Sequence, residues 1–260
     1  MTRLLVVLLL LAGCPPSPPA PDPGCDGALF GLPVANTGLD SSQCRPTCPC
    51  TGISSPDFTT ERLDALRAWT LSTPFDELTS DPYKDPVPES HAAVCGVVVE
   101  DLAARRYHLQ TFDDVAQVAD AGAYLTHHDA CGRCSTLVDF ALYASDRDLG
   151  ARVKKCGLDN LGQPIATLTT CLENLGFTKP CAQIWAFNTN NTRAECLGVC
   201  LSSSTYHHAN GALSDCLACD ETKSGPVFKA VAGRTRRNTG LATAICRPCS
   251  EVRPVAHDYP

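Results

Sequence analysis

The sequence predicts a mainly α protein in which disulfides cross-link the helices and one small antiparallel β-ribbon accompanies them. From Asp113 onward, apolar residues recur at helical spacing in one segment after another. A single pair of segments, 94–99 and 105–112, has the β-branched or alternating character of paired strands. The chain also contains 17 cysteines among 260 residues, a density typical of exported, disulfide-bonded proteins.

The first part of the folded chain is predicted to be irregular. Residues 25–56 are rich in Gly, Pro, Ser and Asp, which favour turns over helices and strands. We therefore expect a strap that is held in place by its four cysteines, Cys25, Cys44, Cys48 and Cys50. Residues 57–260 then form one helix-rich globular domain, because a chain with 44% hydrophobic residues can bury a substantial core.

The globular domain is predicted to begin with a helix over residues 60–71. Leu63 and Leu66 lie at helical spacing there, behind Thr59 or Thr60 as the N-cap. The β-ribbon follows this helix. The remaining helices are predicted over residues 113–121, 132–145, 148–156, 164–175, 181–200 and 226–236.

The N-terminus carries a positive charge at Arg3, followed by the uninterrupted apolar run Leu4–Leu11. Such a run is too short to cross a bilayer, which needs about 20 residues, and is typical of a signal peptide. The run ends in Leu11-Ala12-Gly13-Cys14, which resembles the lipobox of bacterial lipoproteins. The resemblance implies that residues 1–13 are a signal peptide and that Cys14 is the lipid attachment site, carrying acyl chains such as palmitate.

The same resemblance implies in which membrane the protein is located. Pro15 follows the lipidated cysteine, and the lack of an acidic residue there is typical of lipoproteins sent to the outer membrane. Residues 14–24 are rich in proline, which predicts a stiff, extended tether. We therefore expect a domain that is anchored in the outer membrane by its N-terminal lipid and faces either the periplasm or the cell surface.

Sixteen cysteines remain once Cys14 is set aside, and this number is even. Export to an oxidising compartment makes disulfides the expected state of most of them. The spacing of the cysteines does not decide which pairs form. We expect distant cysteines to staple neighbouring helices.

The motif Cys131-Gly132-Arg133-Cys134 is the main candidate for chemistry. It is predicted to lie at the start of a helix, where the helix N-terminus and Arg133 both favour a nucleophilic thiolate. The motif resembles the active site of thioredoxin-fold oxidoreductases, and this resemblance implies that Cys131 attacks and Cys134 resolves the mixed disulfide. That fold places the motif after a strand of a βαβ unit, and the sequence predicts no strand of that kind before residue 131.

The same residues are similar to the local signature of papain-like cysteine hydrolases, whose second cysteine is the nucleophile and whose first is disulfide-bonded. This resemblance assigns the attack to Cys134. Arg133 and Ser135 stand where the signature has a small residue and an aromatic residue. The base would be one of the downstream histidines, His207, His208 or His257.

A metal site is a further alternative. Two other cysteine pairs, Cys216 with Cys219 and Cys246 with Cys249, are separated much as in four-cysteine zinc sites, although export favours disulfides. Histidine neighbours at 127–128 and 207–208 could add imidazole ligands. Adjacent residues point in different directions, however, and we expect these histidines to lie on the surface beside a loop.

The C-terminal residues 223–260 carry seven basic groups against two acidic ones, in a chain whose formal net charge is −7. Arg234, Arg236 and Arg237 are candidates for binding an anionic ligand, because guanidinium groups bind carboxylate or phosphate with two hydrogen bonds. The alternative is that they pair with acidic groups of the same protein. A sequence pI near 5.4 argues against a nucleic-acid partner.

These observations favour a lipid-anchored, disulfide-rich envelope lipoprotein with a non-catalytic binding or structural role. A thiol-based enzyme that uses Cys131 and Cys134 is the alternative, and a metal-binding protein is the second alternative. The state of the two cysteines distinguishes these functions: an enzyme exposes at least one of them in a cleft, whereas a scaffold buries both in long-range bridges. The sequence predicts no cofactor and leaves open whether the protein is an enzyme.

Overall fold

The computed structural model describes residues 29–86 and 92–260. These residues contain eight α-helices and three β-sheets, with 39% helix and 15% strand. The predicted signal peptide (1–13), the lipid attachment site Cys14, the tether (14–24) and Cys25 lie outside the described residues, so the statements about them stay predictions. No helix within the described ranges is both long and apolar enough to cross a membrane.

The largest sheet has four strands in the order β5-β7-β6-β8. β6 (Val94–Asp101) and β7 (Arg106–Phe112) form the antiparallel hairpin that the sequence predicts. β8 (Tyr124–His128) pairs antiparallel with the other edge of β6. The two-residue β5 (Thr70–Leu71) pairs parallel with β7.

The prediction of a mainly α protein with one small ribbon is wrong, because the chain also forms β8 and two smaller sheets. The local sequence pattern does not predict these strands. Each strand of the two smaller sheets has only two residues, and one of these sheets joins opposite ends of the chain. β8 has the sequence Tyr-Leu-Thr-His-His, which lacks clear alternation. The short strands are β1 (Leu29–Phe30), β2 (Cys44–Arg45) and β9 (Arg247–Pro248) in one sheet, and β3 (Thr47–Cys48) and β4 (Ile53–Ser54) in the other.

The predicted helices form, with shifted ends. α1 spans Thr60–Arg67, and the side chain of its N-cap Thr59 accepts a hydrogen bond from the Arg62 amide. The other helices are α2 (Val115–Asp120), α3 (Leu137–Ser145), α4 (Leu149–Asp159), α5 (Ile165–Glu173), α6 (Lys179–Cys200), α7 (Asp215–Lys223) and α8 (Gly225–Ala232). The sequence pattern does not predict α7, because none of its residues is buried and it therefore has no apolar stripe.

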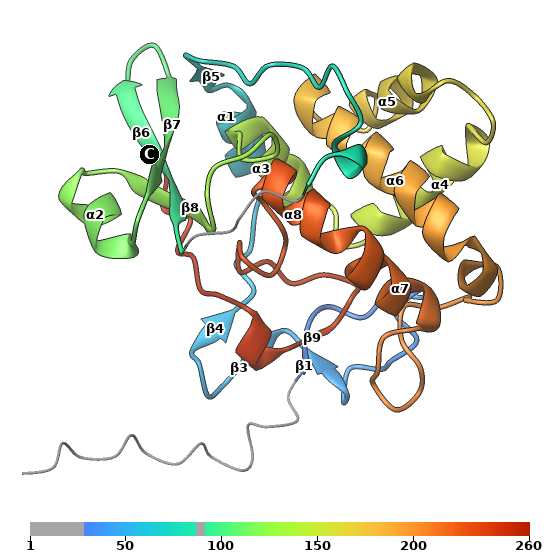
Figure 1. Ribbon diagram of the computed structural model, residues 1–260. Helices are drawn as coiled ribbons and strands as arrows, with labels where there is room; N and C mark the ends of the chain where they lie inside the picture. The colour runs from blue at the N-terminus through green and yellow to red at the C-terminus, as the bar shows by residue number, and fades with distance from the viewer. Residues whose placement is uncertain (1–28, 87–91) are drawn as a thin grey trace, which may run out of the picture.

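The main core surrounds α3. This helix lies between the four-stranded sheet on one side and the helices α4 to α7 on the other (Figure 1). Its residues Leu137, Phe140 and Leu142 are buried together with Tyr107 of the sheet and Ile184 of α6. Because partners cover α3 on both sides, the helix fixes the position of the loop that precedes it.

Disulfides connect the elements, as predicted for a disulfide-rich protein. Cys50 is disulfide-bonded as well, so all 15 cysteines in the described part of the chain are in disulfides. The seven bridges between described residues are Cys44–Cys246, Cys48–Cys249, Cys95–Cys131, Cys134–Cys181, Cys156–Cys171, Cys196–Cys219 and Cys200–Cys216.

The N-terminal strap packs against the C-terminal end of the chain. Its two bridges to that end close separations of 202 and 201 residues. Phe30 and Ile53 of the strap also share a small buried cluster with Val252. The two ends of the described chain therefore form one substructure beside the main core.

Candidate functional site

The motif Cys131–Cys134 lies in the loop between β8 and α3. A strand that the sequence does not predict therefore precedes the motif. β8 pairs antiparallel with β6, however, so the motif is not part of a parallel strand–helix–strand unit. The helix begins at Leu137, with Thr136 as its N-cap, so Cys134 lies outside the first helical turn.

The two motif cysteines bond to different, distant partners. Cys131 is bonded to Cys95 on β6, and Cys134 is bonded to Cys181 on α6. Cys134 and both partners are fully buried. A thiol–disulfide oxidoreductase needs its two motif cysteines to pair with each other, and a cysteine hydrolase needs an accessible thiolate. Cys131 and Cys134 are not paired with each other, and neither of them is an accessible thiolate.

The motif packs tightly against the chain at the end of α8. A Cβ atom on Gly132 would lie 2.6 Å from the backbone carbonyl carbon of Ala232. The amides of Arg133 and Cys134 donate hydrogen bonds to the carbonyls of Val231 and Ala232, at 3.0 and 2.9 Å. Because backbone contacts backbone here, glycine is required at position 132.

A histidine and a serine that flank the motif form a buried pair. Nε2 of His127 lies 2.7 Å from Oγ of Ser135, and its Nδ1 lies 2.7 Å from the carbonyl oxygen of His128. A carbonyl can only accept, so Nδ1 carries the proton and Nε2 accepts from the serine hydroxyl. Burial lowers the pKa of His127 well below its usual value and keeps the ring neutral.

This pair has the contacts of a nucleophile and a base, yet His127 and Ser135 are both 0% exposed. Oγ of Ser135 also accepts the Gly132 amide at 2.8 Å. Since no substrate can reach the pair, its role is to hold the motif loop in place. No local sequence pattern predicts this pair, and the expectation of a surface position is wrong for His127.

Arg234, one of the predicted anion-binding residues, is fully buried. Its Nε donates to the carbonyl of Cys134 at 2.9 Å, and its Nη atoms donate to the carbonyls of Thr126 and Ser135 at 3.2 and 3.0 Å. Its guanidinium carbon lies 5.0 Å from the ring centroid of Phe140. The arginine is used within the protein and joins the motif loop to β8.

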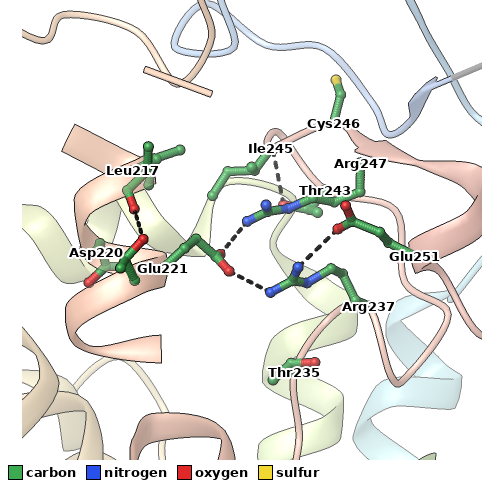
Figure 2. A network of polar contacts seen from close by, with 12 residues as sticks. Leu217, Asp220, Glu221, Thr235, Arg237, Thr243, Ile245, Cys246, Arg247 and Glu251 are labelled. Carbon is green, nitrogen blue, oxygen red and sulfur yellow. Dashed lines mark hydrogen bonds and ion pairs between the residues drawn. The ribbon is translucent and has the colours of Figure 1, made fainter. Parts of the chain in front are cut away.

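Arg237 takes part in a partly buried ion-pair network. It pairs with Glu221 and with Glu251, the latter at 2.9 Å, and Arg247 pairs with the other oxygen of Glu221 (Figure 2). The nearby carboxylates raise the pKa of Arg237 against the effect of its partial burial. In this network, Glu221 and Glu251 neutralise the positive charges of Arg237 and Arg247.

Arg236 donates to the carbonyl of Asp146 and lies over the ring of Tyr143, with 5.6 Å between the guanidinium carbon and the ring centroid. Each of the three arginines proposed as an anion site thus has partners inside the protein. Each arginine has a different set of partners, so the three guanidinium groups do not form one shared binding site. These contacts favour the alternative that the arginines act within the protein, and the binding of an anion by Arg234, Arg236 and Arg237 stays a prediction.

The three histidines considered as a base have other roles. His207 is buried, contrary to expectation, and its Nε2 accepts the Cys246 amide at 3.0 Å. His208 is exposed and lies 3.3 Å from a carboxylate oxygen of Asp215. His257 is buried, with its Nε2 2.8 Å from a backbone carbonyl, and burial lowers its pKa to about 3. None of these contacts involves Cys134.

The cysteine pairs considered for zinc are divided among four disulfides. Cys216 and Cys219 bond to partners on α6, whereas Cys246 and Cys249 bond to the strap. Within residues 29–86 and 92–260, no group of three or more His, Cys, Asp or Glu side chains is placed to hold a metal ion.

Two hollows open on the surface. The first, of about 350 Å³, lies at the start of α2 and is lined by charges of both signs, including Asp113, Asp129, Lys229 and Arg253. Lys229 and Asp129 already form an ion pair of 3.2 Å. The second hollow, of about 550 Å³, lies between α4 and α5. Neither contains a residue of the motif or a candidate histidine.

The comparison with known families gives one match. Residues 165–255 match a family of unknown function (DUF8771). The matched region runs from α5 through α8 to the C-terminal strand and includes the three arginines described above. No curated protein and no solved structure matches the chain.

Proposed function

We propose that the protein is a lipid-anchored envelope lipoprotein whose disulfide-bonded domain has a non-catalytic binding or structural role at the outer membrane. The signal-peptide pattern and the lipobox at Cys14 support the anchor and the address. The disulfides within the described residues support a domain built for an oxidising compartment.

One observation carries the non-catalytic part of this proposal. Cys131 and Cys134 are bonded to β6 and α6 through separate bridges, of which Cys134–Cys181 is fully buried, so neither is a free thiol and the two do not form a redox pair. The residues around them, among them His127, Ser135 and Arg234, use their hydrogen bonds to fix this loop. The loop connects the strand, the helices and the C-terminal segment to one another, so its role is structural.

A disulfide map of the mature protein tests the non-catalytic role. The protein, purified from an exporting bacterial host, is treated with iodoacetamide and digested without reduction, and the peptides are analysed by mass spectrometry. We expect linked peptides for Cys95–Cys131 and Cys134–Cys181 and no labelled thiol. We also expect no acceleration of insulin reduction by dithiothreitol. A bridge between Cys131 and Cys134, or a labelled Cys134, would contradict the proposal and favour a thiol enzyme.

Metabolic labelling with an alkyne analogue of palmitate tests the anchor. We expect the label on the wild-type protein and on the Cys25→Ser variant, and none on the Cys14→Ser variant. Pro15→Asp tests the address: it should move the protein from the outer to the inner membrane fraction. Equal labelling of the Cys14→Ser variant would exclude Cys14 as the attachment site.

A further inference from the structure

The C-terminal end of α6 exposes three aliphatic side chains. Leu197, Val199 and Leu201 have 49%, 40% and 80% of their surface exposed. Leu197 and Leu201 are four residues apart and so share one face of the helix. Single exposed apolar residues are common, but Leu197 and Leu201 are adjacent on this face and form a small apolar surface, whereas Val199, two residues from each, projects from another side of the helix end. We refer to these three residues as the α6 tip.

The chain around the α6 tip carries no charge. Residues 196–206 include no acidic or basic side chain. The hydroxyls of Ser202 and Ser203 donate to the carbonyl of Val199, at 3.1 and 3.2 Å. These polar groups therefore have partners within the tip, which lowers the free-energy cost of moving it out of water.

Two disulfides make the α6 tip rigid. Cys196–Cys219 and Cys200–Cys216 join the last two turns of α6 to α7. A preformed surface loses little conformational entropy when it binds. The aliphatic side chains are thus held in the exposed position and cannot fold back into the domain.

The loop that follows the α6 tip contacts the strap, which is the first described segment of the chain. The loop that follows α6 binds the strap, since the amides of Tyr206 and His207 donate to the carbonyls of Asn36 and Thr37, at 2.8 and 3.0 Å. The loop lies on the same lower side of Figure 1 as β1, which begins at Leu29. Fourteen residues separate Leu29 from Cys14, and an extended segment of that length spans at most about 45 Å.

We propose that the α6 tip contacts the phospholipid surface to which the lipid anchor is attached, so that the domain lies on the membrane in one orientation. This inference rests on the proposed lipid anchor. A second copy of the chain fits the tip less well, because a stable interface needs roughly 800 Å² from each partner and three aliphatic side chains provide far less. A bilayer accepts a small apolar surface, and the anchor holds it close.

Tryptophan substitution with lipid-borne quenchers tests this orientation. The lipidated full-length protein is reconstituted into phosphatidylcholine vesicles that contain doxyl-labelled acyl chains. Leu201→Trp reports on the α6 tip. Leu102→Trp is the matched control, because Leu102 is 62% exposed in the turn between β6 and β7, on another side of the fold. Leu197→Trp gives a second probe of the tip if the first variant does not fold.

Interfacial side chains insert roughly 5–10 Å, so we expect shallow doxyl groups to reduce the added emission of Leu201→Trp about twofold. The control emission should be unaffected by doxyl groups and quenched by aqueous iodide. If Leu201→Trp behaves like the control, the domain does not lie on its α6 tip. Protection from iodide without doxyl quenching would mean that a second copy covers the tip, and this result also overturns the inference.

Vesicle flotation of the same samples separates the two proposals. Protein that floats with the vesicles but shows a water-exposed indole in Leu201→Trp retains the anchor and loses the orientation. Protein that does not float has no anchor, which overturns the proposed function and the orientation that rests on it.

Discussion

Replacing Asp139 with asparagine should remove a measurable part of the pH dependence of stability. Asp139 is fully buried in α3. One carboxylate oxygen accepts the Thr178 amide at 2.8 Å, and the other accepts the hydroxyls of Thr136 and Thr178 at 2.6 and 2.7 Å. Burial raises the pKa of this group from 3.8 to about 6, and the hydrogen bonds oppose the shift without cancelling it.

The sign of the effect follows from these pKa values. Between pH 3.8 and about 6 the folded protein holds a proton on Asp139 that the unfolded chain has released. The free energy of unfolding therefore decreases as the pH rises through this window. A shift of about two pKa units at 1.36 kcal/mol each amounts to about 3 kcal/mol. Asparagine stays neutral and can still accept the Thr178 amide, so the variant should lack this decrease.

Guanidinium chloride unfolding at several pH values between 3.5 and 7, with the disulfides intact, measures the effect. The wild-type protein should lose about 3 kcal/mol of stability relative to Asp139→Asn across this range. Asp64→Asn, which removes an exposed carboxylate paired with Arg67, should give a nearly flat difference. If the Asp139→Asn difference is also flat, or has the opposite sign, burial does not dominate the environment of Asp139 and the reasoning is wrong.

Two further predictions concern the motif loop. Arg234→Met leaves three buried carbonyls without the donor that Arg234 supplies, and should lower the free energy of unfolding by about 3–5 kcal/mol in chemical denaturation. Arg234→Lys should lower it by a smaller amount, because an ammonium group can reach some but not all of the same acceptors. A change below about 1 kcal/mol in Arg234→Met would refute the structural role. Gly132→Ala should cost more than about 2 kcal/mol, because its Cβ would overlap the backbone of Ala232. Gly198→Ala, in α6 with nothing within 4 Å of the new Cβ, should instead stabilise by up to about 1 kcal/mol; equal effects of the two glycine variants would contradict the close approach at Gly132.

The elements that could be predicted from the sequence are those set by local interactions. The β6–β7 hairpin follows from β-branched residues and alternation, and α1 begins at Thr60 because Thr59 caps it. β8 was missed, since five residues without alternation resemble a loop. Missing β8 led to a fold class with too little sheet.

In the candidate site, too, the local sequence predicted the residue types but not their distant partners. The residue types around Cys131 and Cys134 are those of a reactive thiol, which is why the sequence makes them the main candidate for chemistry. Their partners, Cys95 and Cys181, lie 36 and 47 residues away, and no spacing rule selects them from the other cysteines. Arg234 was predicted to bind an anion or to pair with acidic groups, because the sequence does not show that buried backbone carbonyls surround it.

By itself, the sequence determined the number of cysteines and the helices with clear apolar faces, and its signal pattern predicts an oxidising destination. These depend on composition and on contacts within a few residues. The tertiary structure alone decided which cysteines pair, that His127 and Ser135 bond across the motif, and that Arg234 lies inside the protein. Those outcomes depend on segments that are far apart in the chain and meet only when β8, α3 and the end of α8 pack together.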